Sequence, residues 1–579
     1  MTEQRGSGPA ERSGQLRLDA AGAGGGRRAP ALPNRRGHKG LVEAMRKPRK
    51  AKPEANKSQP RPGGKPSLVP RNGQGKPIEA NKSQGAARRR RSTGRSGIRT
   101  RELPAGTVTE WAPYTVAPES EWVVDLRPAT FDHEMHLRRS AEYQAGNSWL
   151  GAVFEIDRPF DGAAFETALY LWTAHHEVLR STVSLKYFPG DRAVGCRPDG
   201  ITRRYTHPAG AIGIHGRVTG AMTGDAITAH LTSTFDAELS PLTWPHHRAV
   251  TITDLDPDFG GQERFVAVLA ADHCVVDAYS LLVAIGELRA FYLAEVDGTQ
   301  PRSSCAGSHL DYGIHDRKAG AELTPVHPAV THWRTFLAAS GWRFPDSGLT
   351  SAQPVTSHDA PGSCGGSEFV LSAREADEVN RICREAGHSM QTTVFTALAL
   401  AHRAVTGEPR MRAAMPMHTR FEPRYVDAIG WFVGLGPLDV DVRAAESFRR
   451  AMDLTTGAIG AAKAVSRYPY PRIAQLTGCE AIPEFVISYL DVRYVPGAAD
   501  WARLKAQTLR GRTESDREVY LWVARTPDGI TVSTRHPGTA AAAAAVRDFV
   551  DTAVEILSRV GTEGVDAPLE GVVAAQLPA

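Results

Sequence analysis

A seven-residue apolar run, Phe265 to Ala271, most constrains how this chain can fold. The run has the length of a strand and is too short for a buried helix of its own, so it predicts a strand covered on both faces. Polar residues follow this run directly. Asp272, His273 and Asp277 lie in a predicted loop, and an apolar stretch with helical spacing comes after it. The chain therefore places a histidine where a buried strand meets a helix.

His273 lies at a position that suits a general base. Its imidazole has an unperturbed pKa of about 6.5, so it can take a proton from a hydroxyl or an amine near neutral pH. A histidine at a strand end, taken alone, is more often a core residue satisfied by backbone groups. The neighbouring residues therefore decide between the two interpretations.

The string D-H-C-V-V-D-A, from Asp272 to Ala278, resembles the H-H-x-x-x-D-G signature of the condensation-domain superfamily, the chloramphenicol acetyltransferase-like acyltransferases. His273 takes the place of the second histidine, which the resemblance makes the catalytic one, and Asp277 takes that of the aspartate. Asp272 replaces the first histidine, a form similar to that of glycolipid acyltransferases of the polyketide-associated (Pap) type. Ala278 replaces the glycine, and its Cβ would be unfavourable if the backbone had a positive φ or lay against a substrate.

Further segments resemble the same superfamily in the same order, over roughly residues 104 to 560. They are H-H-E-V-L-R-S-T-V (His175 to Val183), S-T-F-D-A-E-L-S-P-L (Ser233 to Leu242), S-H-L-D-Y-G-I-H-D-R (Ser308 to Arg317), P-M-H-T-R (Pro416 to Arg420), A-I-G-W-F-V-G (Ala428 to Gly434) and E-F-V-I-S-Y-L-D-V (Glu484 to Val492). Each is weak alone, but their shared order is strong support. T-V-T-E-W-A-P (Thr107 to Pro113) and C-G-G (Cys364 to Gly366) are more similar to Pap-type proteins than to peptide-synthetase modules.

The resemblance implies an α/β fold of two chloramphenicol acetyltransferase-like lobes, a V-shaped pseudo-dimer with the active-site tunnel between them. We expect an N-terminal lobe over residues 101–342 with the motif, a Pro- and Gly-rich linker over 343–366, and a C-terminal lobe over 367–579. The residue pattern favours alternating elements in the second lobe. It predicts strands over 368–371, 410–417 and 434–442, and helices over 373–386 and 392–405.

The function implied by the resemblance is acyl transfer with His273 as the general base and no bound cofactor. The donor would be a fatty or polyketide acyl thioester, on coenzyme A or on the phosphopantetheine arm of a carrier protein. The acceptor would be a sugar or alcohol hydroxyl, in lipid or glycolipid biosynthesis. By the same resemblance Asp277 pairs with Arg420 of the second lobe and supports the site structurally. Two alternatives stay open. One is a free-standing amide-forming protein of nonribosomal peptide synthesis. The other is an inactive binding or scaffold protein, which is suggested by the departures from the signature at Asp272 and Ala278.

Residues 1–100 differ from the rest of the chain. They contain no Phe, Trp or Tyr and carry 25 basic and 6 acidic residues, a formal charge of +19, whereas the remainder carries 44 basic and 58 acidic residues, a charge of −14. Such a segment cannot bury enough apolar surface to offset its ordering entropy, so it is predicted to be disordered. Its R-R-R-R run is compatible with an anionic membrane surface, although a dispensable extension or a start codon placed too early is favoured. No aromatic residue accompanies the basic ones, so no specific nucleic acid is expected.

No metal site is expected. The six cysteines form no C-x-x-C pair, and the H-E-V-L-R that begins at His176 lacks the second histidine of H-E-x-x-H. Cys274 adjoins His273 but lacks an orienting group for a nucleophile, and His176 falls on an apolar helical face and is interpreted as a core residue. With no membrane-spanning stretch and no secretory signal, we expect a cytoplasmic monomer, at most peripheral to the inner membrane face.

Overall fold

The computed structural model describes residues 103–118, 121–143, 148–185, 203–301, 306–350, 364–479, 481–511, 515 and 517–569. The predictions for the basic segment, residues 1–100, lie outside these residues, as does the part of the predicted 343–366 linker over residues 351–363.

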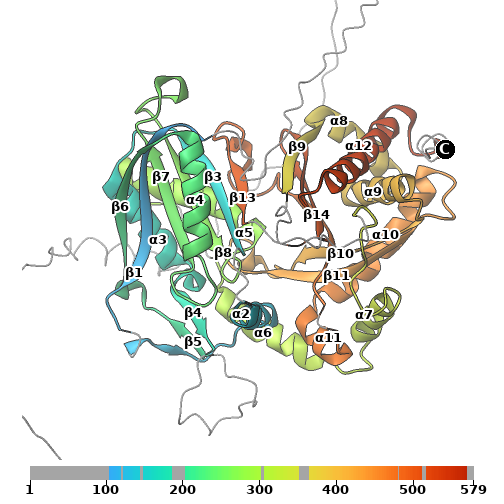
Figure 1. Cartoon of the computed structure of the whole chain (residues 1–579), viewed down its shortest axis with the longest axis horizontal. Coiled ribbons are helices and arrows are strands. Elements are labelled where there is room, and N and C mark those ends of the chain that lie inside the picture. Colours follow the sequence, from blue (N-terminus) through green and yellow to red (C-terminus); the bar gives the residue numbers. More distant parts are fainter. Residues whose placement is uncertain are drawn as a thin grey trace, which may run out of the picture. The chain divides into compact units, whose positions relative to one another are not determined.

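Six antiparallel strands form the first sheet (Figure 1). Their order is β13 (Gln507–Arg510), β3 (Trp149–Ile156), β8 (Phe265–Asp272), β7 (His247–Thr253), β1 (Gly106–Thr115) and β6 (Ile212–Met222). The predicted strand is β8, which lies between β3 and β7, and every one of its residues is buried.

Successive residues of β8 face two different helical layers. Val266, Val268 and Ala270 belong to the core cluster formed with α4 (Gly224–Glu238). Phe265 points to the other face, where its ring contacts Phe165 of α3 (Gly162–His175) and Tyr292 of α5 (Ala278–Val296). The continuous apolar run is therefore explained by helices on both faces of the sheet.

Strand β13 joins the first sheet from a distant part of the chain. Gln507 to Arg510 pair with β3, in a register from Gln507 opposite Val153 to Arg510 opposite Leu150. Figure 1 shows this short orange strand beside the green and cyan strands. The residues assigned to the C-terminal lobe thus supply one strand to the sheet of the other lobe, and the boundaries over 343–366 stay a prediction.

The second sheet is mixed. Its order is β11 (Val433–Asp441), β10 (Arg410–His418), β12 (Phe485–Asp491), β14 (Val519–Thr526), β15 (Gly529–His536) and β9 (Cys364–Ser372). β12 runs parallel to both β10 and β14. The strands and helices predicted over 368–442 correspond to β9, α8 (Ala373–Glu385), α9 (Met390–Thr406), β10 and β11.

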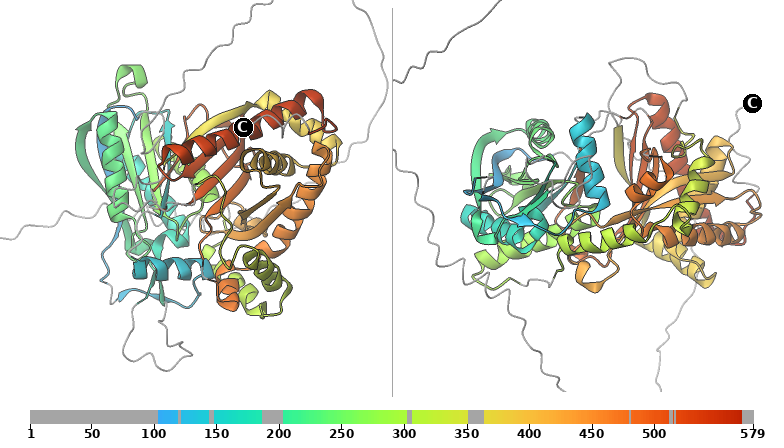
Figure 2. Two further views of the ribbon diagram at one scale, coloured as in Figure 1. Left: turned by 45° about the vertical axis from the view of Figure 1, so that its right-hand side comes forward. Right: turned by 90° about the horizontal axis from the view of Figure 1, so that it is seen from below.

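Helices cover both faces of the second sheet as well. Helices α8, α9 and α12 (Ala540–Glu563) share one core cluster with α10 (Phe448–Ser466) and the sheet, whereas α7 (Pro328–Ala338) and α11 (Tyr470–Thr477) pack in another. Alternation along β10 explains the division, since Ala413 and Met415 belong to the first cluster and Ala414 to the second. Figure 2 shows α12 and α9 together on one side of this sheet. Both sheets thus have the layered α/β arrangement that was predicted.

The remaining elements are small. A three-stranded sheet contains β2 (Val124–Asp125), β5 (Arg203–Thr206) and β4 (Ser181–Ser184). Val183 of β4 packs with Leu137 of α2 (Phe131–Tyr143), and α2 in turn contacts α6 (His309–Glu322). His176 was expected on an apolar helical face, but α3 ends at His175. His176 has an extended backbone after α3, and a short 3-10 helix follows over Glu177–Arg180.

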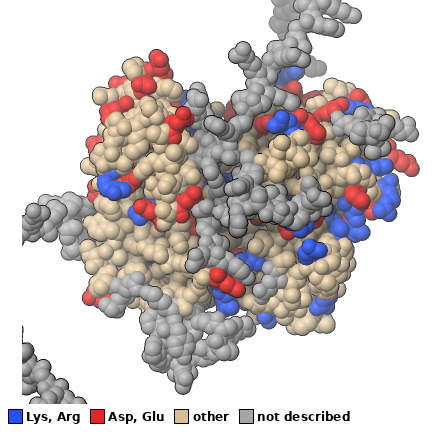
Figure 3. Space-filling model, in the orientation of Figure 1, with Lys and Arg blue, Asp and Glu red and all other residues tan. Residues whose placement is uncertain are grey.

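The face shown in Figure 3 carries both basic side chains (Lys and Arg, blue) and acidic ones (Asp and Glu, red). Among the helices described, none combines the length and the apolarity needed to cross a membrane.

Candidate active site at the end of strand β8

The predicted motif spans the end of β8, a tight turn and the start of α5. Asp272 is the last residue of the strand rather than a loop residue, and His273 begins the turn. Asp277 caps α5, because its carboxylate accepts a 2.7 Å hydrogen bond from the Ser280 N–H. Capping satisfies a backbone donor at the start of the helix, so the turn that carries His273 is held at both ends.

Asp272 is fully buried and accepts three hydrogen bonds. Its Oδ2 accepts from Ser148 Oγ at 2.5 Å, and its Oδ1 accepts from the Cys274 N–H at 2.8 Å and from His136 Nε2 at 3.1 Å. Burial alone would raise the pKa of Asp272, but His136 and these hydrogen bonds hold it well below its usual range. Asp272 is therefore an ionised acceptor that fixes the turn before His273.

His273 is partly exposed, and its ring packs against the indole of Trp431. The two ring centroids lie 4.0 Å apart with the planes tilted by 36°. Burial and then the nearby His136 lower the pKa of His273 below 6.5, while Asp277 and Asp272 act in the opposite direction. The imidazole is therefore neutral at pH 7, the form that a general base requires.

Asp277 and Arg420 form a bidentate ion pair. Arg420 Nη1 donates to Asp277 Oδ2 at 2.7 Å, and Nη2 donates to Oδ1 at 3.0 Å. Oδ2 also accepts from the Phe432 N–H at 3.0 Å. Burial raises the pKa of Asp277, but the charge and hydrogen bonds of Arg420 outweigh it, so the net pKa is lowered.

The Arg420 guanidinium connects α5 to the segment before β11. Its Nη2 also donates to Ser280 Oγ at 2.8 Å and to the Ala428 carbonyl at 3.2 Å. The rings of Tyr279 and Phe432 lie 4.7 Å and 4.5 Å from its central carbon. The pair is thus enclosed by aromatic and backbone groups, which is the setting in which the loss of one partner destabilises most.

Ala278 is compatible with its position. It is the first residue of α5, and the non-glycine residues with positive φ in the described chain are Asp254, Trp342 and Lys505. Its side chain lines a cavity of about 650 Å³, together with Leu282 and Ile285 of the same helix and residues of β9, β13, β14 and β15. Cavities of this size are typical of small-molecule sites, and Ala278 is the residue of the motif that borders this one.

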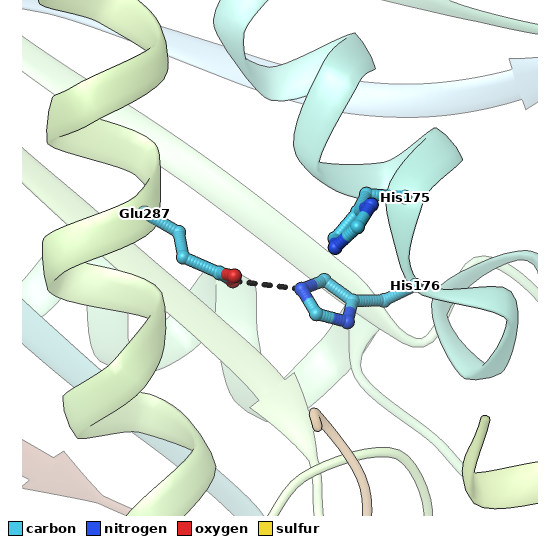
Figure 4. Close-up of side chains that lie close together, drawn as sticks. All are labelled: His175, His176 and Glu287. Atoms are coloured by element: carbon cyan, nitrogen blue, oxygen red, sulfur yellow. Dashed lines mark hydrogen bonds and ion pairs between the residues drawn. The ribbon is translucent and has the colours of Figure 1, made fainter. Parts of the chain in front are cut away.

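His175, His176 and Glu287 are the residues in the described chain that could together hold a metal ion. One donor atom from each lies within 4.8 Å of the others. Figure 4 shows the two histidines directed from the end of α3 toward Glu287 of α5, where His176 Nε2 lies 2.7 Å from the Glu287 carboxylate. This hydrogen bond explains how His176 is buried between two helices, as its interpretation as a core residue requires.

Cys274 is buried, and burial followed by the charge of Asp272 raises the pKa of its thiol. A protonated, enclosed thiol is a poor nucleophile. Cys383 and Cys479 are also free and buried. Cys196 and Cys305 lie outside the described residues.

Three residues support the site through contacts that were not predicted from the sequence. His136 of α2 and Ser148 before β3 hold Asp272, and Trp431 packs against His273. Trp431 does lie in the A-I-G-W-F-V-G segment, where its identity was a usable signal. His136 and Ser148 lie far from the motif along the chain, and no local pattern marks them.

Comparisons with known proteins agree with this geometry. The condensation-domain family model matches residues 259–487. The acyltransferase PapA3 of Mycobacterium tuberculosis is 23% identical over 496 residues, which cover 81% of this chain and 98% of PapA3. The trehalose-2-sulfate acyltransferase PapA2 of Mycobacterium bovis is 23% identical over 295 residues, 50% of this chain and 62% of that protein.

The fold is also shared with a solved structure. That of a PapA2 acyl transferase superposes with a TM-score of 0.68 at 20% identity, over 79% of this chain and 98% of that one. The motif, the family match and the PapA relatives identify the chain as an acyltransferase that is similar to condensation domains, with the Pap-type acyltransferases among its relatives.

Proposed function

We propose that the protein transfers a fatty or polyketide acyl group from a thioester to a hydroxyl of a sugar or alcohol, with His273 as the general base. The observation that carries this proposal is the neutral, partly exposed imidazole of His273 on a turn held by Asp272 and Asp277. The relative PapA2 is named as a trehalose-2-sulfate acyltransferase, which supports a sugar acceptor.

The proposed reaction has two proton transfers on one histidine. The acceptor hydroxyl gives its proton to His273 while its oxygen attacks the thioester carbonyl, which forms a tetrahedral intermediate. The carbon–sulfur bond then breaks, and the imidazolium returns the proton to the departing thiolate. An ester and a free thiol result, and no acyl-enzyme forms.

Neighbouring groups favour the charged histidine that forms during this reaction. The indole face of Trp431 lies against the His273 ring, and a cation over an aromatic face is stabilised. The Asp272 and Asp277 carboxylates raise the pKa of His273. The cavity beside α5 would supply the other main contribution, the alignment of two bound substrates.

The test incubates the full chain with acyl-coenzyme A thioesters of several lengths and with sugar, alcohol and amine acceptors, and follows products by mass spectrometry. An O-acylated product that is lost with His273→Ala supports the proposal. An N-acylated product alone would favour the amide-forming alternative. If neither coenzyme A donors nor acyl carrier proteins give any product, the proposal is wrong and an inactive binding role is favoured.

A further inference from the structure

Arg510 lies at the border of the cavity. It ends β13, and its guanidinium carbon lies 3.4 Å from the ring centroid of Trp522 on β14. Both side chains line the cavity that also borders Ala278. Within the described part of the chain, no acidic side chain forms an ion pair with Arg510.

The other cations of the cavity wall are paired. Lys505 pairs with Glu155, and Arg535 pairs with Glu518 at 2.9 Å. Arg535 also lies over Tyr520, 4.3 Å from its ring centroid, and 5.6 Å from that of Trp522. Arg510 and Arg535 thus share the indole of Trp522, and among the residues that the structure describes a carboxylate balances Arg535 but not Arg510.

The environment of Arg510 penalises an uncompensated positive charge. Burial, with a smaller effect of Arg535, lowers the pKa of Arg510 to about 9. Arg510 is only partly buried, but removing a cation from water is still unfavourable unless an opposite charge or acceptors accompany it. An anion beside Arg510 would remove much of this penalty, and the guanidinium fork matches two oxygens of a phosphate or a sulfate.

We propose that Arg510, Arg535 and Trp522 form an anion subsite, which binds a phosphate or sulfate ester carried by one of the substrates. The indole face of Trp522 fixes the plane of the Arg510 guanidinium, and Arg535 adds a second positive charge. The subsite shares its cavity with Ala278 at the start of α5, so an anchored substrate extends toward the motif. This inference rests on the proposed acyl transfer and adds that one substrate is anionic.

The anionic group has two possible sources, and a binding experiment distinguishes them. Titration calorimetry on the full chain would compare coenzyme A with pantetheine, which lacks its phosphates, and trehalose 2-sulfate with trehalose. Arg510→Met should weaken binding of one charged ligand by about 10- to 100-fold, the range for a hydrogen bond to a charged group. The loss should be smaller for Arg510→Lys, and absent for the neutral ligands.

Arg381→Met is the matched control, because Arg381 is an exposed arginine that pairs with Glu378 and Glu385 within α8. A loss confined to coenzyme A assigns the subsite to the donor, and a loss confined to trehalose 2-sulfate assigns it to the acceptor. If the wild-type protein binds neither charged ligand better than its neutral counterpart, or if Arg510→Met binds as tightly as Arg381→Met, the subsite does not exist.

Kinetics separate this inference from the proposed function. In an active protein, Arg510→Met should raise KM for the charged substrate and leave kcat and KM for its neutral analogue unchanged. Turnover that is equal for charged and neutral substrates in both proteins would refute the subsite while acyl transfer stands. Charge-selective binding that Arg510→Met abolishes, in a protein without turnover, would refute acyl transfer while the subsite stands.

Discussion

The replacement of Arg420 by methionine should destabilise the protein strongly, by about 3–5 kcal/mol. Asp277 and Arg420 are only 1% and 6% exposed. Without the guanidinium, the Asp277 carboxylate keeps the N–H groups of Ser280 and Phe432 and loses both charged donors. A buried charge would then be left partly compensated. The expected loss is a large share of the roughly 5–15 kcal/mol that holds a domain folded.

Urea unfolding of the full chain, followed by circular dichroism and tryptophan fluorescence, would measure this loss. Asp277→Asn should also destabilise, because it leaves the Arg420 cation buried. The double variant should lose less than the sum of the single variants, with a coupling of about 1–3 kcal/mol.

The exposed pair of Arg381 with Glu378 supplies the control. Arg381→Met should change stability by less than about 1 kcal/mol. The reasoning would be refuted if Arg420→Met cost no more than this control, or if the effects at Asp277 and Arg420 were additive.

Three further predictions concern the site. His273→Ala should lower kcat by about 10²–10⁴-fold and leave the urea midpoint unchanged; parallel losses of folding and activity would point to a structural histidine instead. Because the neutral imidazole is the base and its pKa is lowered from 6.5, kcat/KM should fall with decreasing pH with a midpoint below pH 6.5, and a midpoint above 6.5 in a pH–rate profile would contradict this. Gly430→Ala should lower Tm, since its Cβ would lie 2.5 Å from Cγ of His309 and overpacking costs about 1–3 kcal/mol; an unchanged Tm would show that the His309 ring can move aside.

The layered fold was predictable where hydrophobic periodicity is strong. The apolar run of β8 and the alternation along β11 identify their strands, since each pattern reflects which faces are buried. The four residues of β13 carry no comparable pattern. Their place beside β3 depends on pairing across several hundred residues of the chain, and local propensity does not encode such pairing.

The candidate site was predictable only along the motif and its matched segments. His273, Asp277 and Arg420 could be named because motif spacing marks them, although the catalytic role of His273 stays a prediction. His136, Ser148 and Trp431 reach the turn through tertiary packing, from α2, from the residue before β3 and from the segment before β11. The contribution of His136 and Ser148 becomes visible only when the chain is folded, whereas Trp431 lies in a segment that the sequence comparison had already matched.

Asp272 is one of the two departures from the family signature that raised an inactive protein as an alternative, and its surroundings argue for activity. The carboxylate is matched to the donors that it meets, since Ser148, His136 and the Cys274 N–H all point at it. A histidine has one acceptor nitrogen at most and could not satisfy three donors. Its negative charge raises the pKa of His273, so it stabilises the imidazolium that forms when His273 takes a proton. The Asp272 carboxylate therefore favours the protonated form of His273 that arises during the reaction. The altered motif is compatible with His273 as a working general base.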